Sequence, residues 1–366
     1  MAQDFLLKLV QQRLDDFCDE KRSDLLEISE ELEPIIDYTK SLLAGGKRFR
    51  ALFCFWAWAG YQESEVDPLK LKLDDPIIGI AAALEMFHAA ALVHDDLIDQ
   101  SDTRRGETAV HKKFEALHKN HGFAGSPERF GAAGSILVGD LMLSWSSELF
   151  GEALLHFHDE AIEKACREEF GKMRFEVMAG QYLDILEENA APTRAAGEAV
   201  ARANKVMLYK TAKYSLEAPL LIGAALGGGD PNQRLGLSSF GIPLGLAFQL
   251  RDDLLGVFGD PVITGKPAGD DLREGKRTVL VGLTLESVPL SIAKTFEELL
   301  TSGTIGDEEL SFMLDTIRES GALERTERLI LEHSKKSIEA LAALEISNQG
   351  RKQLAYLADA VINRSK

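Results

Sequence analysis

Residues 76–99 read PIIGIAAALEMFHAAALVHDDLID and follow an Asp75-Pro76 pair that is typical of a helix start. Apolar side chains cover nearly every face of this segment as far as Val93, and residues 136–145 show the same property. Helices of this kind have to be surrounded by other helices. We therefore expect an all-α fold, with a central layer of helices enclosed by an outer ring.

The rest of the chain supports one large helical domain over residues 1–366. Apolar residues recur at helical spacing in residues 5–14 and 25–36, and no alternation of apolar and polar residues lasts long enough to predict a sheet. The longer loops are expected at residues 118–131, 188–194, 227–232 and 260–275, where Gly, Pro and polar residues gather.

Composition excludes several classes of function. The 366 residues carry 41 Lys+Arg and 59 Asp+Glu, a net charge of −18, which argues against non-specific binding to nucleic acid or anionic membranes. The 3 cysteines lack CxxC spacing, which excludes a disulfide scaffold and fits a reducing compartment. The apolar stretch before Val93 contains Glu85 and His88. We therefore expect a cytoplasmic protein without a signal peptide or a stable membrane anchor.

The strongest chemical signal is the run HDDLID at residues 94–99. Asp95 and Asp99 are four residues apart, so they lie on one helical face and repel each other unless a cation neutralises them. Oxygen ligands at this spacing suit Mg²⁺, which completes its shell with water and phosphate oxygens. An acidic helix end in solvent explains this run equally well when it is taken alone. Arg104 and Arg105 follow at once, however, and guanidinium groups bind phosphate oxygens well.

A second acidic pair ends another apolar helix. Asp252 and Asp253 close the run FQLRDD, Asp260 follows seven residues later, and Lys266 and Lys276 lie in the Gly-rich loop beyond. Two acidic pairs, each followed by basic residues, are stronger evidence for a metal–diphosphate site than either pair alone.

A basic run, GGKRFR, occupies residues 45–50 and lacks the GxxxxGK[ST] pattern of a phosphate-binding loop. Lys47 and Arg50 are three residues apart at a predicted helix start, where an anion is favoured. A solvated basic turn is the simpler reading of this run alone. His88 lies seven residues before Asp95, on the same helical face. A lone histidine in an apolar helix is usually a core residue, but on the metal-binding face it becomes a candidate phosphate donor.

GGKRFR, HDDLID with DTRRG, and FQLRDD with GD occur in this order between Gly45 and Thr278. Together they resemble the motifs of the trans-isoprenyl diphosphate synthases, the polyprenyl synthetase family, and are most like those of geranylgeranyl diphosphate synthases. The resemblance implies the all-α isoprenoid-synthase fold with a central substrate cavity, three Mg²⁺ ions for each active site, and a homodimer. It also implies that isopentenyl diphosphate is condensed with an allylic diphosphate.

The resemblance also implies a role for individual residues. The metal ligands would be Asp95, Asp99 and Asp252, supported by Asp96 and Asp253. The allylic diphosphate would be bound by Arg104, Lys210 and Lys266, with Lys276 nearby, and isopentenyl diphosphate by Lys47, Arg50, His88 and Arg105. Lys210-Thr211, Gln181 with Asp184, and Phe248-Gln249 correspond to the KT, GQxxD and FQ elements of the family. Thr211 and Gln249 would stabilise the allylic cation through their oxygen dipoles.

One position departs from the pattern. The second motif reads DDLLG, so Gly256 stands where the last aspartate of the family's motif usually lies. The two leading carboxylates remain, and we expect metal binding to survive in a weakened form. Asp260 is a candidate substitute if the helix continues that far.

Product length is predicted from the residues before the first motif. Ala91 and Ala90, four and five residues before Asp95, leave room for a growing apolar tail, and Met86 and Phe87 are candidate stops one turn further on. This favours geranylgeranyl diphosphate, with a longer polyprenyl diphosphate as the alternative. Close packing of both alanines against a neighbouring helix would explain them without any role in length.

Three other functions fit the sequence less well. A class I terpene cyclase needs no isopentenyl site, which Lys47, Arg50 and His88 argue against. A non-catalytic partner subunit would have lost metal ligands, but only position 256 departs. An acidic helical scaffold would require all of these motifs to be accidental.

Overall fold

The computed structural model describes residues 2–104, 106–155, 157, 159–194, 196–260 and 268–362. Its internal contacts divide the chain into two compact units, residues 1–55 with 62–164 and residues 56–61 with 165–366. Nearly all regular structure in both units is helical, which confirms the predicted all-α class. The single domain expected over residues 1–366 remains a prediction.

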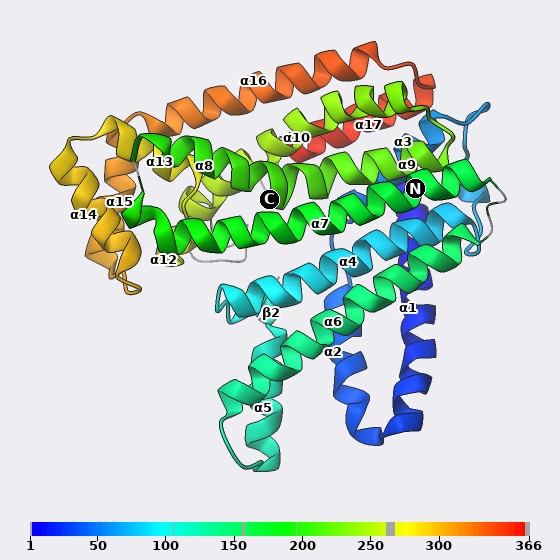
Figure 1. The fold of residues 1–366 in the computed structure, drawn as a ribbon, viewed down its shortest axis with the longest axis horizontal. Helices are drawn as coiled ribbons and strands as arrows, with labels where there is room; N and C mark the ends of the chain where they lie inside the picture. Colours follow the sequence, from blue (N-terminus) through cyan, green and yellow to red (C-terminus); the bar gives the residue numbers. More distant parts are fainter. Residues whose placement is uncertain are drawn as a thin grey trace. The chain divides into compact units, whose positions relative to one another are not determined.

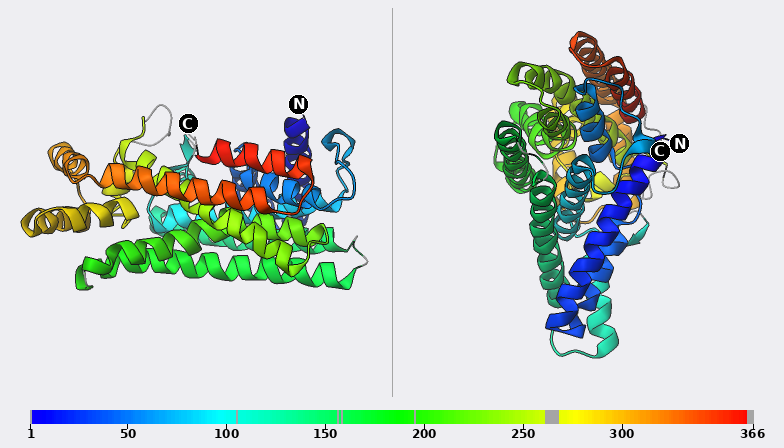
Figure 2. Two further views of the ribbon diagram at one scale, coloured as in Figure 1. Left: turned by 90° about the horizontal axis from the view of Figure 1, so that it is seen from above. Right: turned by 90° about the vertical axis from the view of Figure 1, so that its right-hand side faces the viewer.

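The first unit is built around one buried helix, α4, which packs along α6 (Figures 1 and 2). Its elements are α1 (Ala2–Ile28), η1 (Glu30–Leu32), α2 (Glu33–Leu43), the first part of α3 (Phe49–Gly60), η2 (Pro68–Lys70), α4 (Pro76–Ile98), β1 (Thr103–Arg104), β2 (Glu107–Thr108), α5 (Val110–His121), α6 (Pro127–Leu154) and the start of α7 (Glu160–Ala190). The two-residue strands form a small hairpin that the sequence pattern does not predict.

Small residues bring α4 and α6 close together. A Cβ added at Gly79 would lie only 2.8 Å from the Cβ of Ala153, and the Ser146 hydroxyl donates to the carbonyl oxygen of Ala83 at 2.7 Å. By length and composition alone α4 could cross a membrane, but 78% of its most apolar window is buried inside the structure. Its apolarity therefore reflects its place in the core, as the sequence predicts.

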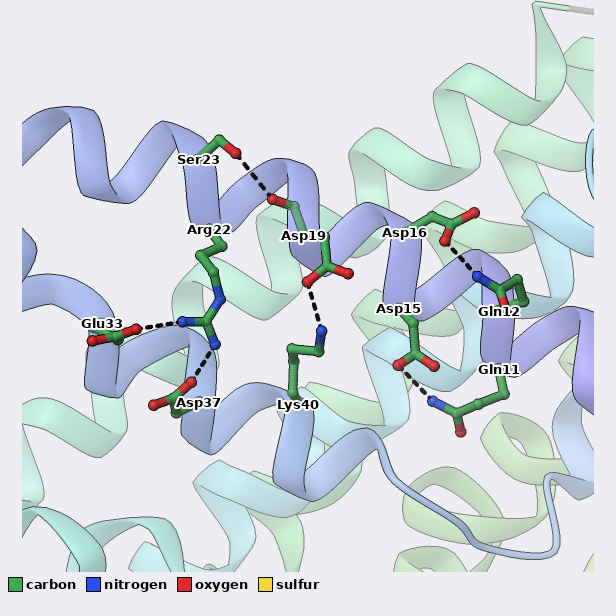
Figure 3. A network of polar contacts seen from close by, with 10 residues as sticks. All are labelled: Gln11, Gln12, Asp15, Asp16, Asp19, Arg22, Ser23, Glu33, Asp37 and Lys40. Atoms are coloured by element: carbon green, nitrogen blue, oxygen red, sulfur yellow. Dashed lines mark hydrogen bonds and ion pairs between the residues drawn. The ribbon is translucent and has the colours of Figure 1, made fainter.

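The α1–α2 pair carries a surface network of charges (Figure 3). Arg22 on α1 lies between Glu33, at 2.6 Å, and Asp37 on α2, and Lys40 contacts Asp19 at 2.6 Å. Exposed pairs of this kind contribute about 0–1 kcal/mol each. The main support for α1 is its apolar face, where Leu6, Val10, Leu14 and Phe17 are fully buried.

The second unit is organised around α10, which packs against α16 and against the π-helix η5 (Figures 1 and 2). Its further elements are the end of α3, the rest of α7, η3 (Ala191–Thr193), η4 (Ala196–Glu198), α8 (Ala199–Val206), η5 (Met207–Glu217), α9 (Ala218–Leu226), α10 (Pro231–Phe258), α12 (Asp270–Arg273), α13 (Val279–Ser287), α14 (Leu290–Thr301), α15 (Asp307–Glu319), α16 (Ala322–Ala343) and α17 (Asn348–Ile362).

The start of α10 is fixed by a capping box. Asp230 accepts from the backbone N–H of Gln233 at 2.9 Å, and the backbone N–H of Asp230 donates to the Gln233 side chain at 2.8 Å. Pro231 occupies the first helical position, where its missing N–H costs nothing. The helix therefore begins sharply, and its far end carries the second acidic motif.

Candidate active site

The first acidic motif lies at the C-terminal end of α4, beyond the part of the helix that is fully buried. Every residue from 77 to 87 is buried, and the half-buried positions beyond them include His88, Ala91, Asp95 and Asp99. These four are spaced by three or four residues, so they form one stripe along the helix. The predicted alignment of His88 with the acidic pair is confirmed, while their roles as ligands remain predictions.

Arg104 links the strand after α4 to the acidic motif. Its Nε donates to Asp96 Oδ1 at 2.7 Å, its Nη2 also contacts Asp96, and Nη2 lies 3.6 Å from Asp95 Oδ2. Burial raises the pKa of Asp96, and the opposing effect of Arg104 does not fully cancel this. Asp96 therefore points inward and holds the guanidinium beside Asp95. Arg105 lies outside the described residues.

Within GGKRFR, the central arginine is structural. Arg48 adopts a positive φ of 47°, its Nη2 donates to the carbonyl oxygen of Leu43 at 2.6 Å, and its Nη1 lies 4.0 Å from Glu85 Oε2. Glu85 in turn accepts from the backbone N–H of Ala51 at 3.0 Å in the first turn of α3. Arg48 and Glu85 are both buried, and no spacing in the sequence predicts that they pair.

The residues on either side of Arg48 are more accessible. Lys47 is exposed and Arg50 is half-buried, so both cations remain candidates for binding isopentenyl diphosphate. Within this motif, Arg48 therefore stabilises the turn, whereas Lys47 and Arg50 on either side of it remain the candidates for substrate binding.

The second acidic motif ends α10. Asp252 is exposed, whereas Asp253 is buried and accepts from the Gln249 side-chain amide at 2.8 Å. Burial raises the pKa of Asp253 well above its ordinary value, and the nearby carboxylates of Asp271 and Asp252 add to this effect. Asp253 therefore orients Gln249, while Asp252 is the more accessible carboxylate of the pair.

Lys210 and Thr211 lie on the π-helix η5, a geometry that is frequent at functional sites. Lys210 forms an ion pair with Asp184 of α7. A Cβ added at Gly180 would lie 2.9 Å from the Cα of Lys210, and one at Gly245 would lie 2.5 Å from the Cα of Ala212. The π-helix is therefore held between α7 and α10 at two glycines.

Gln181, next to Gly180 on α7, has a buried amide nitrogen without a hydrogen-bond partner among the described residues. A buried donor of this kind is costly unless a ligand or water satisfies it. Gln181 therefore stays a candidate for substrate binding.

The loop after α10 contains the remaining predicted cations. Lys276 Nζ lies 2.5 Å from Glu274 Oε2 and 3.6 Å from Asp271 Oδ1. Lys266 belongs to residues 261–267, which lie outside the described residues. Asp260 is exposed, and α10 ends before it, at Phe258. The helix therefore does not continue as far as Asp260. Asp260 was a candidate substitute for the missing aspartate only if the helix did so, and that condition is not met.

The donor set fits magnesium. Each motif offers oxygen-only carboxylates at a helix end, and among the residues that the structure describes no three His, Cys, Asp or Glu side chains are already gathered for a metal. Mg²⁺ typically binds through one or two carboxylates and completes its shell with water and substrate phosphates. Two short carboxylate motifs accompanied by arginine and lysine match that requirement better than they match a closed, all-protein metal cage.

Comparison with known proteins agrees with this chemistry. The sequence model described as "Polyprenyl synthetase" matches residues 29–317. A short chain isoprenyl diphosphate synthase of Methanothermobacter thermautotrophicus is 33% identical over 296 residues, covering 78% of this chain and 79% of the relative. A geranylgeranyl diphosphate synthase of Sulfolobus acidocaldarius is 30% identical over 349 residues, covering 92% and 98%.

A solved structure is similar over the full length. The geranylgeranyl pyrophosphate synthase of Corynebacterium glutamicum, crystallised with isoprenyl diphosphate and magnesium, has a TM-score of 0.90 and 37% sequence identity, covering 100% of this chain and 99% of that one. Fold, motif order and sequence similarity therefore agree, and the chain belongs to the polyprenyl synthetase family.

Proposed function

We propose that the protein is a Mg²⁺-dependent chain-elongating prenyltransferase that condenses isopentenyl diphosphate with an allylic diphosphate and releases geranylgeranyl diphosphate. The observation that carries this proposal is the stripe on α4, which begins at His88 after a fully buried segment and ends at Asp95 and Asp99 beside Arg104. The similarity to synthases named for geranylgeranyl diphosphate supports the product.

In each acidic motif, some aspartates are assigned to the metal and others orient a neighbouring side chain. We assign three Mg²⁺ ions to the site, with Asp95, Asp99 and Asp252 as their protein ligands. These ions would neutralise the diphosphate as it leaves the allylic carbon. Asp96 and Asp253 act by orientation, because Asp96 fixes Arg104 and Asp253 fixes Gln249.

Basic side chains are assigned to the two diphosphate groups, and side-chain oxygens to the allylic cation. Arg104, Lys210 and Lys266 would bind the departing diphosphate, with Lys276 nearby. Lys47, Arg50, His88 and Arg105 would hold isopentenyl diphosphate so that its alkene attacks the allylic cation. Lys266 and Arg105 are assigned by sequence alone. Thr211 and Gln249 would stabilise that cation through their oxygens. The released diphosphate then takes the proton, so no side-chain general base is required.

The direct test is an incubation of the purified protein with Mg²⁺, isopentenyl diphosphate and labelled farnesyl diphosphate, with products resolved by chain length. One added isoprene unit is the expected result. Several added units would keep the mechanism and assign a longer polyprenyl product. A cyclic hydrocarbon, or no turnover with or without a partner protein, would overturn the proposal.

The product length is assigned to the face that carries Ala91. Ala91 is half-buried on the stripe with Asp95, and Phe87 precedes it by one turn, or about 5.4 Å. Ala90 and Met86 are fully buried and lie on a different face of α4. Of the two alanines, Ala91 is therefore the one placed to border a growing chain, with Phe87 as the stop.

Replacing Ala91 with phenylalanine is expected to shift the main product to one isoprene unit shorter, since the added ring fills about one turn of the stripe. Ala90→Phe is the matched control. It should leave the product length unchanged and lower the melting temperature, because overpacking a filled core costs about 1–3 kcal/mol. A length shift with Ala90→Phe and none with Ala91→Phe would reverse the assignment. Product chromatography and thermal melts measure both effects.

We also propose a homodimer formed through α7. Phe175, Met178 and Tyr182 are spaced by three and four residues and are 73%, 52% and 64% exposed. Large apolar side chains in a row on one helix face mark an interaction surface, and a two-fold axis would pair this face with itself.

The change Phe175→Glu with Tyr182→Glu is expected to convert the dimer to a monomer, because it buries two charges in the proposed interface. Light scattering coupled to size exclusion measures the mass. Leu331→Glu on α16 is the control, since Leu331 is comparably exposed at 67% but lies apart from this row. A wild-type monomer, or a dimer that survives the double change, would contradict the α7 interface.

We propose a cytoplasmic location without nucleic-acid partners or a stable membrane anchor. The support is the net charge of −18, the burial of α4 in the core, and three buried cysteines that are all free thiols. Free thiols are typical of reducing compartments.

A further inference from the structure

The π-helix that carries Lys210 and Thr211 is unusually long. Most π-helices form a single turn inside an α-helix, whereas η5 spans 11 residues, Met207–Glu217. A long segment in this rare geometry depends on its neighbours to fix its register. The contacts at Gly180 and Gly245 set how closely α7 and α10 approach η5, but two bare Cα atoms do not select one register over another.

Two lysines of η5 pair with two acids of α7. Lys213 Nζ lies 2.6 Å from Glu176 Oε1, and Lys210 pairs with Asp184. Glu176, Gly180 and Asp184 are four residues apart, so they share one face of α7. A Cβ added at Gly180 would meet the backbone of Lys210. The two ion pairs therefore lie on either side of this close contact, and their acids span about 12 Å of α7.

Lys213 also connects η5 to α10. Its Nζ lies 3.9 Å from Glu217 Oε2, and the Ser238 hydroxyl of α10 donates to Glu217 Oε1. A Cβ added at Gly241, further along α10, would lie 3.1 Å from the Cα of Glu217. The contacts that run from Glu176 through Lys213 and Glu217 to Ser238 form one chain, the Lys213 bridge. This bridge crosses η5 from α7 to α10.

The Lys213 bridge is largely shielded from water. The side chains of Lys213, Glu176 and Glu217 are 14%, 15% and 6% exposed, and the Lys213 ammonium lies 5.3 Å from the ring centroid of Tyr209. Burial disfavours the ammonium, but the hydrogen bond to Glu176 and the nearby carboxylates raise the pKa of Lys213 above its ordinary value. Lys213 therefore stays charged between its two acidic partners.

Buried ion pairs of this kind are weak evidence for stability, because desolvation of the charges offsets much of their attraction. Their best-attested role is to select one register of packed elements, since a shifted arrangement leaves a charge unpaired in the core. A shift of η5 by one residue along α7 would separate Lys213 from Glu176 and would carry Lys210 away from Asp184. The bridge thus ties the position of Lys210 to that of Lys213.

We propose that Lys213 is a positioning residue for Lys210, because the Lys213 bridge fixes the register of η5 in which the Lys210 ammonium binds the allylic diphosphate. This inference rests on the proposed function, since it assigns diphosphate binding to Lys210. In this role Lys213 does not contact substrate. Its effect on the reaction is indirect and requires that Lys210 is present.

The test removes every charge of the bridge together, so that none is left unpaired. In Glu176→Gln/Lys213→Met/Glu217→Gln the side-chain shapes are similar, and the glutamine that replaces Glu217 can still accept from Ser238. The melting temperature should equal or exceed that of wild type. The kcat/KM for farnesyl diphosphate should nevertheless fall by about 10²-fold, the cost of misplacing a binding group by about 1 Å. The KM for isopentenyl diphosphate should stay within about twofold of wild type.

Two further measurements separate positioning from a general structural role. In a Lys210→Met background, the triple change should lower kcat/KM by less than about threefold, because the residue that the bridge positions is gone. Hydrogen exchange of residues 207–217, measured without ligands, should be faster in the triple variant than in wild type. Lys213→Arg keeps the charge of the bridge and should retain kcat/KM to within about tenfold.

Glu169→Gln is the matched control. Glu169 lies on α7 seven residues before Glu176, its side chain is 20% exposed, and its partner at 3.8 Å is Arg234 of α10 rather than a residue of η5. The kcat/KM for farnesyl diphosphate and the hydrogen exchange of residues 207–217 should therefore stay within about twofold of wild type. If the triple variant does not fold, Glu176→Gln alone keeps an acceptor for Lys213 and should lower kcat/KM by about 10-fold.

A folded triple variant with wild-type kcat/KM would overturn the inference, and so would an undiminished loss in the Lys210→Met background. Wild-type protein that does not elongate would instead overturn the proposed function. Hydrogen exchange of residues 207–217 would still decide whether the bridge holds η5, since it needs no substrate, and unchanged exchange in the triple variant would then overturn that role. The two failures are therefore distinguishable.

Discussion

Replacing Asp95 with asparagine is expected to lower kcat/KM for elongation by about 10³-fold or more, which corresponds to roughly 4 kcal/mol of lost transition-state stabilisation. The change removes one of the two carboxylates at the end of the α4 stripe. Asparagine keeps the shape of aspartate, and the contact between Arg104 and Asp96 does not depend on it. The loss would therefore report the negative charge itself.

Asp102→Asn provides the control. Asp102 lies shortly after the end of α4, its side chain is 73% exposed, and it pairs with Lys112 at 3.4 Å, so its loss should change kcat/KM by less than about twofold. Without metal, Asp95→Asn should melt at or above the wild-type temperature, because one of two repelling charges on a helix face is gone. It should also lose the stabilisation that Mg²⁺ with inorganic diphosphate gives the wild type. Retention of most of the activity would contradict the assignment of the first motif as a metal site.

Helices with a strong local signal could be predicted from the sequence. The start of α4 at Pro76 follows from the Asp75-Pro76 pair and the apolar run. The end of the helix, at Ile98, has no comparable local signal. There the chain turns into the short β1–β2 hairpin, where Arg104 returns to Asp96. That contact joins residues eight apart, and no periodicity encodes it.

The loops expected at residues 118–131, 188–194 and 227–232 each contain a break between helices, whereas the longer breaks after Gly60 and after Ile98 were not expected. Helices also extend further into the expected loops than predicted. Helix α5 continues to His121 and α6 begins at Pro127, so the loop predicted over residues 118–131 is shorter than expected. Helix α7 likewise continues to Ala190. Polar residues at helix ends look like loop residues in the sequence, whereas burial of the opposite face keeps them helical.

Candidate metal-binding and phosphate-binding residues are easier to predict from the sequence than the residues that position them. Acidic and basic side chains can be recognised by their type and spacing. The π-helix at Lys210 and Thr211 depends instead on close approach at Gly180 and Gly245, which no local pattern specifies. The same is true of the Lys213 bridge, because it joins side chains from α7, η5 and α10.

Arg48 is the motif residue that most clearly stabilises the fold and does not face a substrate. Replacing it with methionine is expected to cost about 3–5 kcal/mol of unfolding free energy, the usual penalty for removing one partner of a buried ion pair. Glu85 would be left charged in the core, and the carbonyl oxygen of Leu43 would lose its donor. Urea unfolding followed by circular dichroism measures the change.

Two comparisons separate folding from binding within GGKRFR. Lys47→Met changes an exposed neighbour, so its unfolding free energy should shift by less than about 0.5 kcal/mol, while its KM for isopentenyl diphosphate should rise. Adding Glu85→Gln to Arg48→Met should restore part of the lost stability, because the uncompensated charge is then gone, although glutamine can still accept from Ala51. A loss below about 1 kcal/mol in Arg48→Met, or a double variant that is less stable than Arg48→Met, would contradict the buried pair. A small stability loss in Arg48→Met would also mean that Arg48 is available to bind isopentenyl diphosphate. Within GGKRFR, there would then be no reason to assign that substrate to Lys47 and Arg50 alone.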